Sequence, residues 1–149
     1  MKSLHSYHGA GIIFWSRDEN HQVHILIGKR SMSPQNRHWS FPGGGWEPKD
    51  GYDEHDKVAY AKAAIREAGE EMGMAVEHPR QLVLLWGLHV PGFHYRVYAY
   101  ELQQMREPPF IAEFSEAKWV GIHMLPTPLV CFVASQVRSL RRYLKRKNK

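Results

Sequence analysis

The sequence predicts an α+β fold in which a mixed β-sheet lies between helices. Two observations carry this prediction. Short apolar, β-prone segments follow one another with polar turns between them, and two longer segments have helical periodicity. In chain order they run strands, helix, strands, helix, which is typical of a sheet covered by helices. The composition shows no break over 149 residues, so we expect one domain spanning 1–149.

The N-terminal part predicts a hairpin followed by a short strand. Residues 9–15 and 24–27 are apolar and β-prone, and Asp18-Glu19-Asn20 between them favours a turn. Residues 31–37 are polar and contain a proline, which indicates a loop. A short strand at 39–41 is then expected to end in a glycine turn at Gly43-Gly44-Gly45.

The middle of the chain predicts a long helix. Residues 53–72 are rich in alanine, which has the best helix propensity, and Gly73 is well placed to cap the carboxyl end of the helix.

The remainder predicts three strands and a final helix. Strands are expected at 81–90 and 95–102, which Pro91-Gly92 separates, and at 118–120. Prolines then precede the last helix, whose apolar residues follow at spacings of three and four: Val130, Val133, Val137, Leu140 and Leu144.

Composition argues against a membrane or secreted protein. No apolar stretch approaches the ~20 residues needed to cross a bilayer, so no membrane partner is expected. The first eight residues lack the apolar core of a secretory signal, and the single cysteine, Cys131, has no internal partner for a disulfide. These features predict a cytoplasmic setting.

Charge is unevenly distributed along the chain. Residues 43–74 hold eight acidic and four basic residues, whereas the chain as a whole has a net charge of +5. A basic protein attracts a polyanionic substrate, but its acidic patch would repel that substrate unless cations neutralised the patch. A bound metal is the simplest reconciliation. The alternative is a solubilising basic tail beside a solvated acidic helix.

Three glutamates give the acidic segment its chemistry. Residues three and four apart share one face of a helix, so Glu67, Glu70 and Glu71 gather their carboxylates in a small volume. They lie near the carboxyl end of the predicted helix, where the helix dipole disfavours negative charge. Hard divalent cations such as Mg²⁺ bind carboxylates together with substrate phosphates, and would offset this repulsion. An ordinary glutamate-rich surface helix is the alternative.

The segment Arg66-Glu67-Ala68-Gly69-Glu70-Glu71-Met72-Gly73-Met74, preceded by Gly43-Gly44, resembles the Nudix box of the MutT-like Nudix hydrolase superfamily. The family pattern ends Arg-Glu-apolar-any-Glu-Glu-any-Gly-apolar, and each fixed position of that ending matches. Residues 39–44 also resemble the strand and turn that precede the box. The resemblance implies the Nudix fold, an α/β/α sandwich.

Members of this superfamily hydrolyse a nucleoside diphosphate linked to another moiety, using Mg²⁺ or Mn²⁺. Carried over by position, the resemblance implies that Glu67, Glu70 and Glu71 are metal ligands together with a backbone group of Gly44. The turn at Gly43 and Gly44 would also bind the phosphates. Arg66 would hold a glutamate in position, and one of the glutamates would orient or deprotonate water.

The front half of the box departs from the family pattern. The family has a glutamate eight residues before the arginine, where this chain has Val58, and the loop at 46–53 is longer than usual. Glu54 lies one helical turn earlier and could replace the missing glutamate if the helix begins early. The alternative is that the acids at 50–56 only cap the amino end of the helix.

A further catalytic glutamate is expected downstream of the box. Glu113 and Glu116 both precede Trp119, and their spacing resembles the corresponding loop of bacterial RNA pyrophosphohydrolases of this superfamily. There the earlier glutamate serves, so Glu113 is the preferred candidate base. Glu116 is the second candidate, and an ordinary exposed acid is the alternative.

Substrate contacts are predicted from arginines and aromatic residues near the glycine turn. Arg30 and Arg37 flank the loop that leads into it, and Trp39 could stack on a base. The expected partner is a small nucleotide-type molecule: a nucleoside triphosphate, a sugar nucleotide, a dinucleotide polyphosphate, coenzyme A or an RNA 5′ end. RNA has less support, because the basic segment 138–149 is typical of a solvated face. The protein is expected to be a monomer or a homodimer.

A second class of function stays open at this stage. The valine at position 58 and the longer loop would also fit a Nudix-fold module that binds a nucleotide, or senses it in regulation, with little catalysis.

Overall fold

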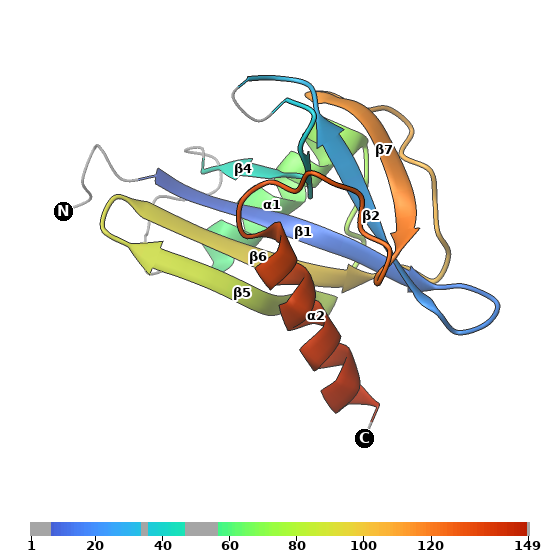
Figure 1. The fold of residues 1–149 in the computed structure, drawn as a ribbon. Coiled ribbons are helices and arrows are strands. Elements are labelled where there is room, and N and C mark those ends of the chain that lie inside the picture. The colour runs from blue at the N-terminus through green and yellow to red at the C-terminus, as the bar shows by residue number, and fades with distance from the viewer. Residues whose placement is uncertain (1–6, 34–35, 47–56, 149) are drawn as a thin grey trace.

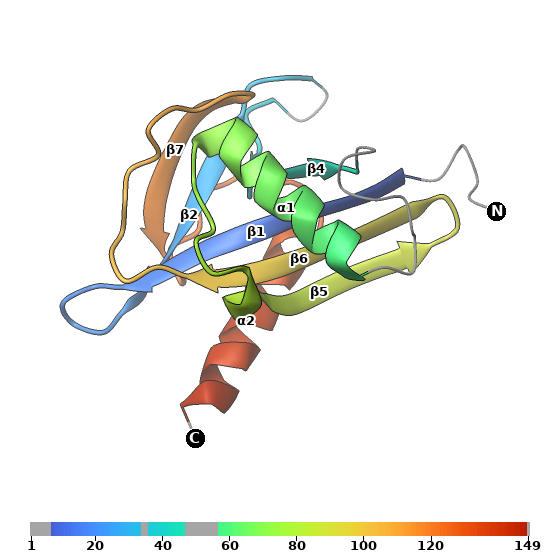
Figure 2. The same cartoon turned by 180° about the vertical axis from the view of Figure 1, so that it is seen from behind.

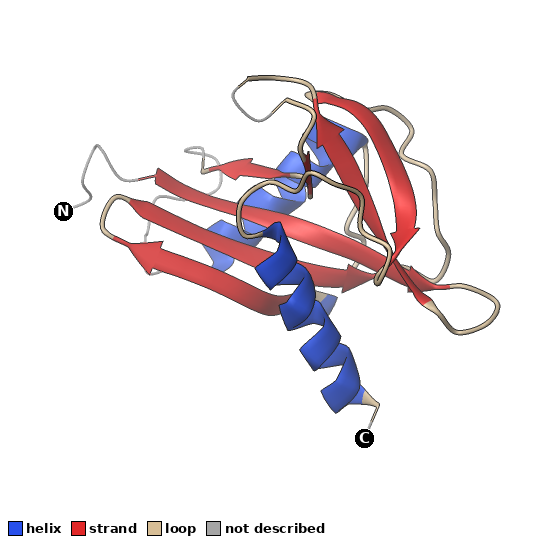
Figure 3. Ribbon diagram, viewed as in Figure 1, coloured by secondary structure: helices blue, strands red, loops and turns tan. Residues whose placement is uncertain are grey.

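The computed structural model describes residues 7–33, 36–46 and 57–148. A mixed sheet and two long helices make up this part of the chain (Figures 1 and 3). In chain order the elements are β1 Tyr7–Arg17, β2 Val23–Arg30, β3 Trp39–Ser40, β4 Gly43–Gly45, α1 Lys57–Met72, the 3-10 turn η2 Pro79–Gln81, β5 Val83–Val90, β6 Phe93–Glu101, β7 Phe114–Gly121 and α2 Val133–Lys147.

The sheet is built around β1. Its strand order is β3-β2-β1-β6-β5, with β4 paired to β1 and β7 paired to β2. β1 and β6 run parallel, whereas the other pairs are antiparallel, so the predicted mixed sheet is confirmed. The predicted N-terminal hairpin is the antiparallel pair β1 and β2, in which Trp15 lies opposite Ile25.

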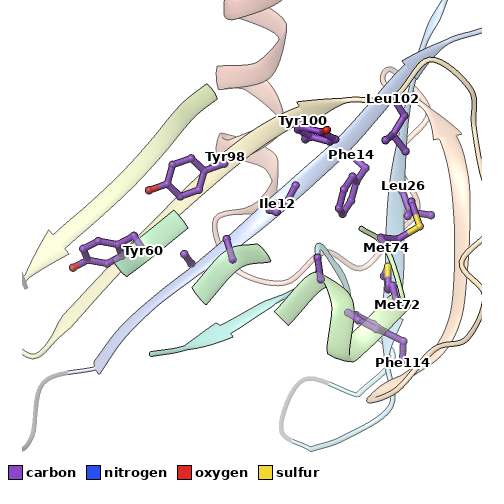
Figure 4. Close-up of a cluster of buried hydrophobic side chains, with 13 residues drawn as sticks. Ile12, Phe14, Leu26, Tyr60, Met72, Met74, Tyr98, Tyr100, Leu102 and Phe114 are labelled. Atoms are coloured by element: carbon purple, nitrogen blue, oxygen red, sulfur yellow. The ribbon is translucent and has the colours of Figure 1, made fainter. Parts of the chain in front are cut away.

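The two helices cover opposite faces of the sheet, α2 in front in Figure 1 and α1 in front in Figure 2. β1 is therefore apolar on both sides, since its successive side chains enter different cores. Ile12 and Phe14 belong to the core beneath α1, which is drawn in Figure 4, while Ile13 and Trp15 belong to the core beneath α2. The predicted α/β/α arrangement is confirmed.

The glycine segment is a strand rather than the predicted turn. Gly43 and Gly45 pair with Gly11 and Gly9 of β1, so four glycines share the face of the sheet that α2 covers. A side chain at Gly43 would collide with the Tyr95 hydroxyl and with backbone of β1. Glycine marks a turn in many sequences, but here it permits close packing.

Boundaries of the other elements differ modestly from the predictions. α1 is described from Lys57, and the predicted first turn at 53–56 lies outside the described residues. β7 is longer than predicted, because it follows β2 along most of that strand's length. α2 begins at Val133, and Val130 packs against the same core from the preceding loop.

Gly73 ends α1 as predicted. Its φ is +63°, and its N–H donates to the Gly69 carbonyl at 3.0 Å, while the Met74 N–H reaches the Ala68 carbonyl at 3.3 Å. This left-handed cap satisfies carbonyls that the helix end would leave without partners.

None of the described helices is both long enough and apolar enough to span a membrane.

Gly69 within α1 and Gly73 at the carboxyl-terminal cap provide a matched test of this cap. Gly69→Ala adds a methyl group into open space within the helix and should stabilise the protein by about 0.5–1 kcal/mol. Gly73→Ala forces an alanine into the left-handed region and against Pro109 and Phe110, so it should destabilise by at least about 1 kcal/mol. Urea unfolding measures both. Equal effects of the two substitutions would contradict the cap.

Candidate active site

The last two turns of α1 bring three carboxylates against the glycine strand β4. Glu67 and Glu71 face β4, and Glu70 lies at the outer edge of the group with half of its side chain exposed. The spacing of three and four residues along the helix produces this grouping.

Glu71 is the most deeply buried of the three. Its side chain is 3% exposed, and its Oε1 accepts a 2.7 Å hydrogen bond from the Gly43 N–H. Oε2 lies 3.6 Å from Arg30 Nη1 and finds no hydrogen-bond donor in the described part of the chain. Burial raises the pKa of Glu71 to about 8, although the Gly43 N–H and the Arg30 charge oppose the shift.

Arg66 holds the rest of the cluster together. Its Nη1 donates to Glu67 Oε1 at 2.8 Å and to Glu70 Oε2 at 3.1 Å, and its Nη2 donates to the Gly45 carbonyl at 2.7 Å. The guanidinium therefore joins two carboxylates of α1 to the backbone of β4. Charged hydrogen bonds of this kind fix both distance and direction.

The Glu67 carboxylate occupies the space that a side chain at Gly44 would need. A Cβ at Gly44 would lie less than 3 Å from the carboxylate atoms of Glu67. Burial raises the pKa of Glu67, and the hydrogen bond from Arg66 opposes the shift. The backbone of β4 thus lies directly against the carboxylates.

The loop before β7 brings Glu113 toward the same carboxylates. The Ala112 N–H donates to the Glu71 carbonyl at 2.7 Å, and the Ser31 N–H donates to the Glu113 carbonyl at 3.1 Å. The charge of Glu113 contributes to the raised pKa of both Glu67 and Glu71. This loop is therefore tied to the end of α1.

Glu116 lies on the other face of the sheet. It sits within β7 opposite Lys29, and it shares a face with Lys118, whose ammonium packs on the Trp39 ring. The structure therefore places Glu113, and not Glu116, near Glu67 and Glu71.

The three residues predicted to contact substrate lie in different environments in the structure. Arg30 lies beside Glu71, with its guanidinium 5.0 Å from the centroid of the Phe114 ring. Arg37 is exposed, and only its backbone N–H contacts Arg30, at the carbonyl. Trp39 is 5% exposed in the core beneath α2, between Lys29 and Lys118. The prediction that Trp39 stacks on a base is wrong, because core residues cover its ring.

A cavity that the sequence did not indicate opens beside Gly43 and Arg30. Its volume is about 380 Å³, and it lies between the sheet and the amino end of α2. The residues that line it beyond Gly43 and Arg30 include Tyr7, Trp86, Phe93, Tyr95, Phe132 and Gln136. The only signal in the sequence was the alternation of aromatic residues at 93 and 95, which put two rings on one face of β6.

The front of the box is partly described. Val58 lies in the first turn of the described helix and is 53% exposed. Glu54, which was considered as its replacement, lies outside the described residues.

The donor set fits a hard divalent cation. The side-chain groups available to a cation are carboxylate oxygens, and one of them, Oε2 of the buried Glu71, has no hydrogen bond within the described residues. Across residues 7–33, 36–46 and 57–148, no three acidic, histidine or cysteine side chains are already arranged around a common point. Arg66 binds oxygens of Glu67 and Glu70 in the present arrangement, so these oxygens would have to turn toward a cation.

Comparison with known proteins agrees with this geometry. The family model described as NUDIX domain matches residues 7–142. Many solved structures are similar to this chain, and three of them illustrate the likeness. A Nudix hydrolase from M. smegmatis, RenU, has a TM-score of 0.71 at 20% identity, covering 93% of this chain and 86% of that one. A search of curated protein sequences found no match.

The other two structures were solved as complexes. The NUDIX domain of Shewanella oneidensis NrtR, complexed with ADP ribose, has a TM-score of 0.72 at 18% identity, covering 97% of this chain and 90% of that one. A C. elegans Ap4A hydrolase binary complex has a TM-score of 0.66 at 19% identity, covering 93% and 98%.

The chain belongs to the NUDIX domain family, because the family model covers nearly all of it. The predicted family and fold are therefore confirmed. Family membership also supports the predicted assignment to the Nudix-type hydrolases.

Burial of Glu71 predicts how stability depends on pH. The pKa of this carboxyl is about 8 in the folded protein, against an ordinary value of 4.5, so the folded state holds a proton that the unfolded chain releases. Without metal, stability should therefore fall as pH rises from about 5 to about 8, by up to about 1.4 kcal/mol per pH unit. Thermal unfolding in a chelator measures this slope.

Glu71→Gln should remove most of that slope, since an amide does not titrate. Glu77→Gln is the matched control, because the Glu77 side chain is 65% exposed, and it should keep the wild-type slope. A Glu71→Gln protein whose stability still falls across this interval would contradict the assignment.

Proposed function

We propose that the protein is a metal-dependent pyrophosphohydrolase that cleaves a phosphoanhydride bond in a nucleoside diphosphate linked to another moiety. One observation carries the proposal: the carboxylate cluster and the cavity share a wall. Gly43 and Arg30 both contact Glu71, and both line the cavity. A diphosphate at this wall would place its nucleoside in the cavity and its anhydride beside the glutamates.

Glu67, Glu70, Glu71 and the Gly44 carbonyl would hold Mg²⁺ or Mn²⁺. When bound, the metal supplies charge neutralisation for the diphosphate and a more acidic water. Arg66 would keep Glu67 and Glu70 oriented from the backbone of β4.

The remaining steps fall to residues of this chain. Arg30 would contact the phosphates, because it lies between Glu71 and the cavity. Glu113 would accept a proton from the attacking water. The water oxygen bonds to phosphorus as the anhydride P–O bond breaks, and the departing phosphate keeps the electron pair of that bond. Arg37 is exposed and would meet only the outer part of a substrate.

The substrate class draws support from two relatives. One is named as an Ap4A hydrolase, and the other is a NUDIX domain solved with ADP ribose; both names refer to a nucleoside with linked phosphates. A cytoplasmic setting belongs to the same proposal, since Cys131 is an exposed free thiol.

A nucleotide-binding module with little catalysis is the second candidate. It is favoured by the exposed Val58, which stands where the family box has a glutamate.

Turnover separates the two candidates. A panel of nucleoside triphosphates, sugar nucleotides, dinucleotide polyphosphates, coenzyme A and 5′-triphosphate RNA, assayed with Mg²⁺ and with Mn²⁺, should yield a substrate whose products are identified by mass. Glu70→Gln should lower kcat by about 10²-fold or more, because it removes a charged ligand oxygen. The exposed Glu77→Gln should leave kcat unchanged. Full activity of Glu70→Gln would sink the proposal.

Glu113 and Glu116 form a matched pair for the base. Glu113→Gln should lower kcat by about 10²-fold and abolish the acidic limb of the pH profile of kcat, since an amide accepts no proton. Glu116→Gln should change neither quantity, because that residue lies on the opposite face of the sheet. The reverse pattern would transfer the role to Glu116.

A further inference from the structure

A glutamine in the first turn of α2 lines the cavity beside Gly43 and Arg30 with a side chain that is mostly buried. Gln136 is 6% exposed, its carboxamide has no hydrogen bond to another described residue, and its polar atoms are not among the fully buried atoms that lack a partner. Its backbone N–H is already used, since it donates to the Phe132 carbonyl at 3.0 Å. Because the carboxamide lines the cavity and makes no hydrogen bond to another described residue, it can bond a ligand held there.

Gln136 lines the 380 Å³ cavity together with Trp86 and Phe132. The centroids of these two rings lie 5.6 Å apart near the amino end of α2. The Trp86 indole N–H donates a hydrogen bond to the Ser135 hydroxyl at 3.0 Å. The wall around Gln136 is therefore largely apolar. Apolar rings with one convergent carboxamide form a surface that can stack a flat heterocycle and bond its edge.

The polar groups of the cavity lining restrict which heterocyclic base can bind there. No aspartate or glutamate lines the cavity in the described part of the chain, and the cation Arg30 lies at the end that approaches Glu71. A carboxamide offers one donor side and one acceptor side. It therefore pairs fully with an edge that carries one acceptor next to one donor.

Adenine has such an edge, with the N1 or N7 acceptor beside the N6 amino donor. Guanine presents three polar groups in a row on its pairing edge, and so does uracil. A single carboxamide would leave one of these groups unpaired against the apolar wall, which is unfavourable.

We propose that Gln136 is a specificity-determining residue that binds the edge of an adenine base held in this cavity. The inference rests on the proposed function for the position of the diphosphate, and it adds the identity of the base and the residue that selects it. The N6 amino group and the carboxamide N–H₂ are both donors, so they cannot bond to each other. The carboxamide oxygen therefore accepts a hydrogen bond from N6, and the carboxamide N–H₂ donates to the adjacent ring nitrogen.

Binding tests this assignment independently of turnover. The Glu70→Gln protein is titrated with ADP and with purine riboside 5′-diphosphate, which lacks only the N6 amino group, and Kd is measured by calorimetry. ADP should bind about tenfold more tightly or better, since the analogue leaves the Gln136 oxygen unpaired. GDP should bind more weakly than ADP.

Gln136→Met in the same background keeps the length of the side chain and removes both hydrogen bonds. It should bind ADP and the analogue with equal Kd, while Gln22→Met, a change of an exposed glutamine in the β1–β2 turn, should keep the tenfold preference. Thermal unfolding verifies that each variant folds. Equal binding of ADP and its analogue by the parent, tighter binding of GDP, or an unchanged preference in Gln136→Met would each overturn the inference.

The outcomes are separable from the proposed function. Selective ADP binding that depends on Gln136, in a protein with no turnover of any substrate, would support this inference and refute the hydrolase. Turnover without base preference would do the opposite.

Discussion

The hydrogen bond from the Gly43 N–H to Glu71 is the interaction on which the arrangement of the site depends. A carboxylate buried as deeply as Glu71 is costly unless donors face it. Here one donor comes from the backbone of β4 and a positive charge comes from Arg30 at the end of β2. Because backbone must reach the carboxylate, β4 has to approach α1 closely. That requirement explains the glycine at position 44, where a Cβ would meet the Glu67 carboxylate, whereas a Cβ at Gly43 would meet the Tyr95 hydroxyl on the other side.

Other contacts reinforce the same approach. Arg66 joins α1 to the carbonyl of Gly45, and the loop that carries Glu113 is fastened to the end of α1 through the Ala112 N–H. Three segments far apart in sequence, the end of β2, β4 and the loop before β7, thus contact about two turns of α1. Like charges are held together there by a guanidinium and by backbone dipoles, which leaves the cluster suited to cations.

The sequence was most informative where the determining interactions are local. The glutamate spacing, the helix and its glycine cap depend on residues within a few turns of each other, and the structure shows the helix and cap as predicted. The pairing of strands across the sheet was harder to predict from the sequence. The parallel contact of β1 with β6 stacks the Tyr7 ring on the Phe93 ring. The antiparallel pairing of residues 43–45 with β1 makes a strand, β4, where a turn was expected. Trp39 was misjudged for the same reason, since its neighbours Lys29 and Lys118 arrive from other strands.

β4 has different neighbours on its two sides. Gly44 faces the Glu67 carboxylate, whereas Gly43 lies beneath the Tyr95 hydroxyl on the side that α2 covers. The single backbone of β4 therefore separates the glutamates of α1 from the side of the sheet that α2 covers. The residues that would choose a nucleoside and the residues that would break its phosphate bond belong to separate packing environments. Substitutions at positions 86, 132 or 136 can consequently redraw the preferred ligand while the helix of glutamates is left untouched, so selectivity and reactivity can be engineered one at a time.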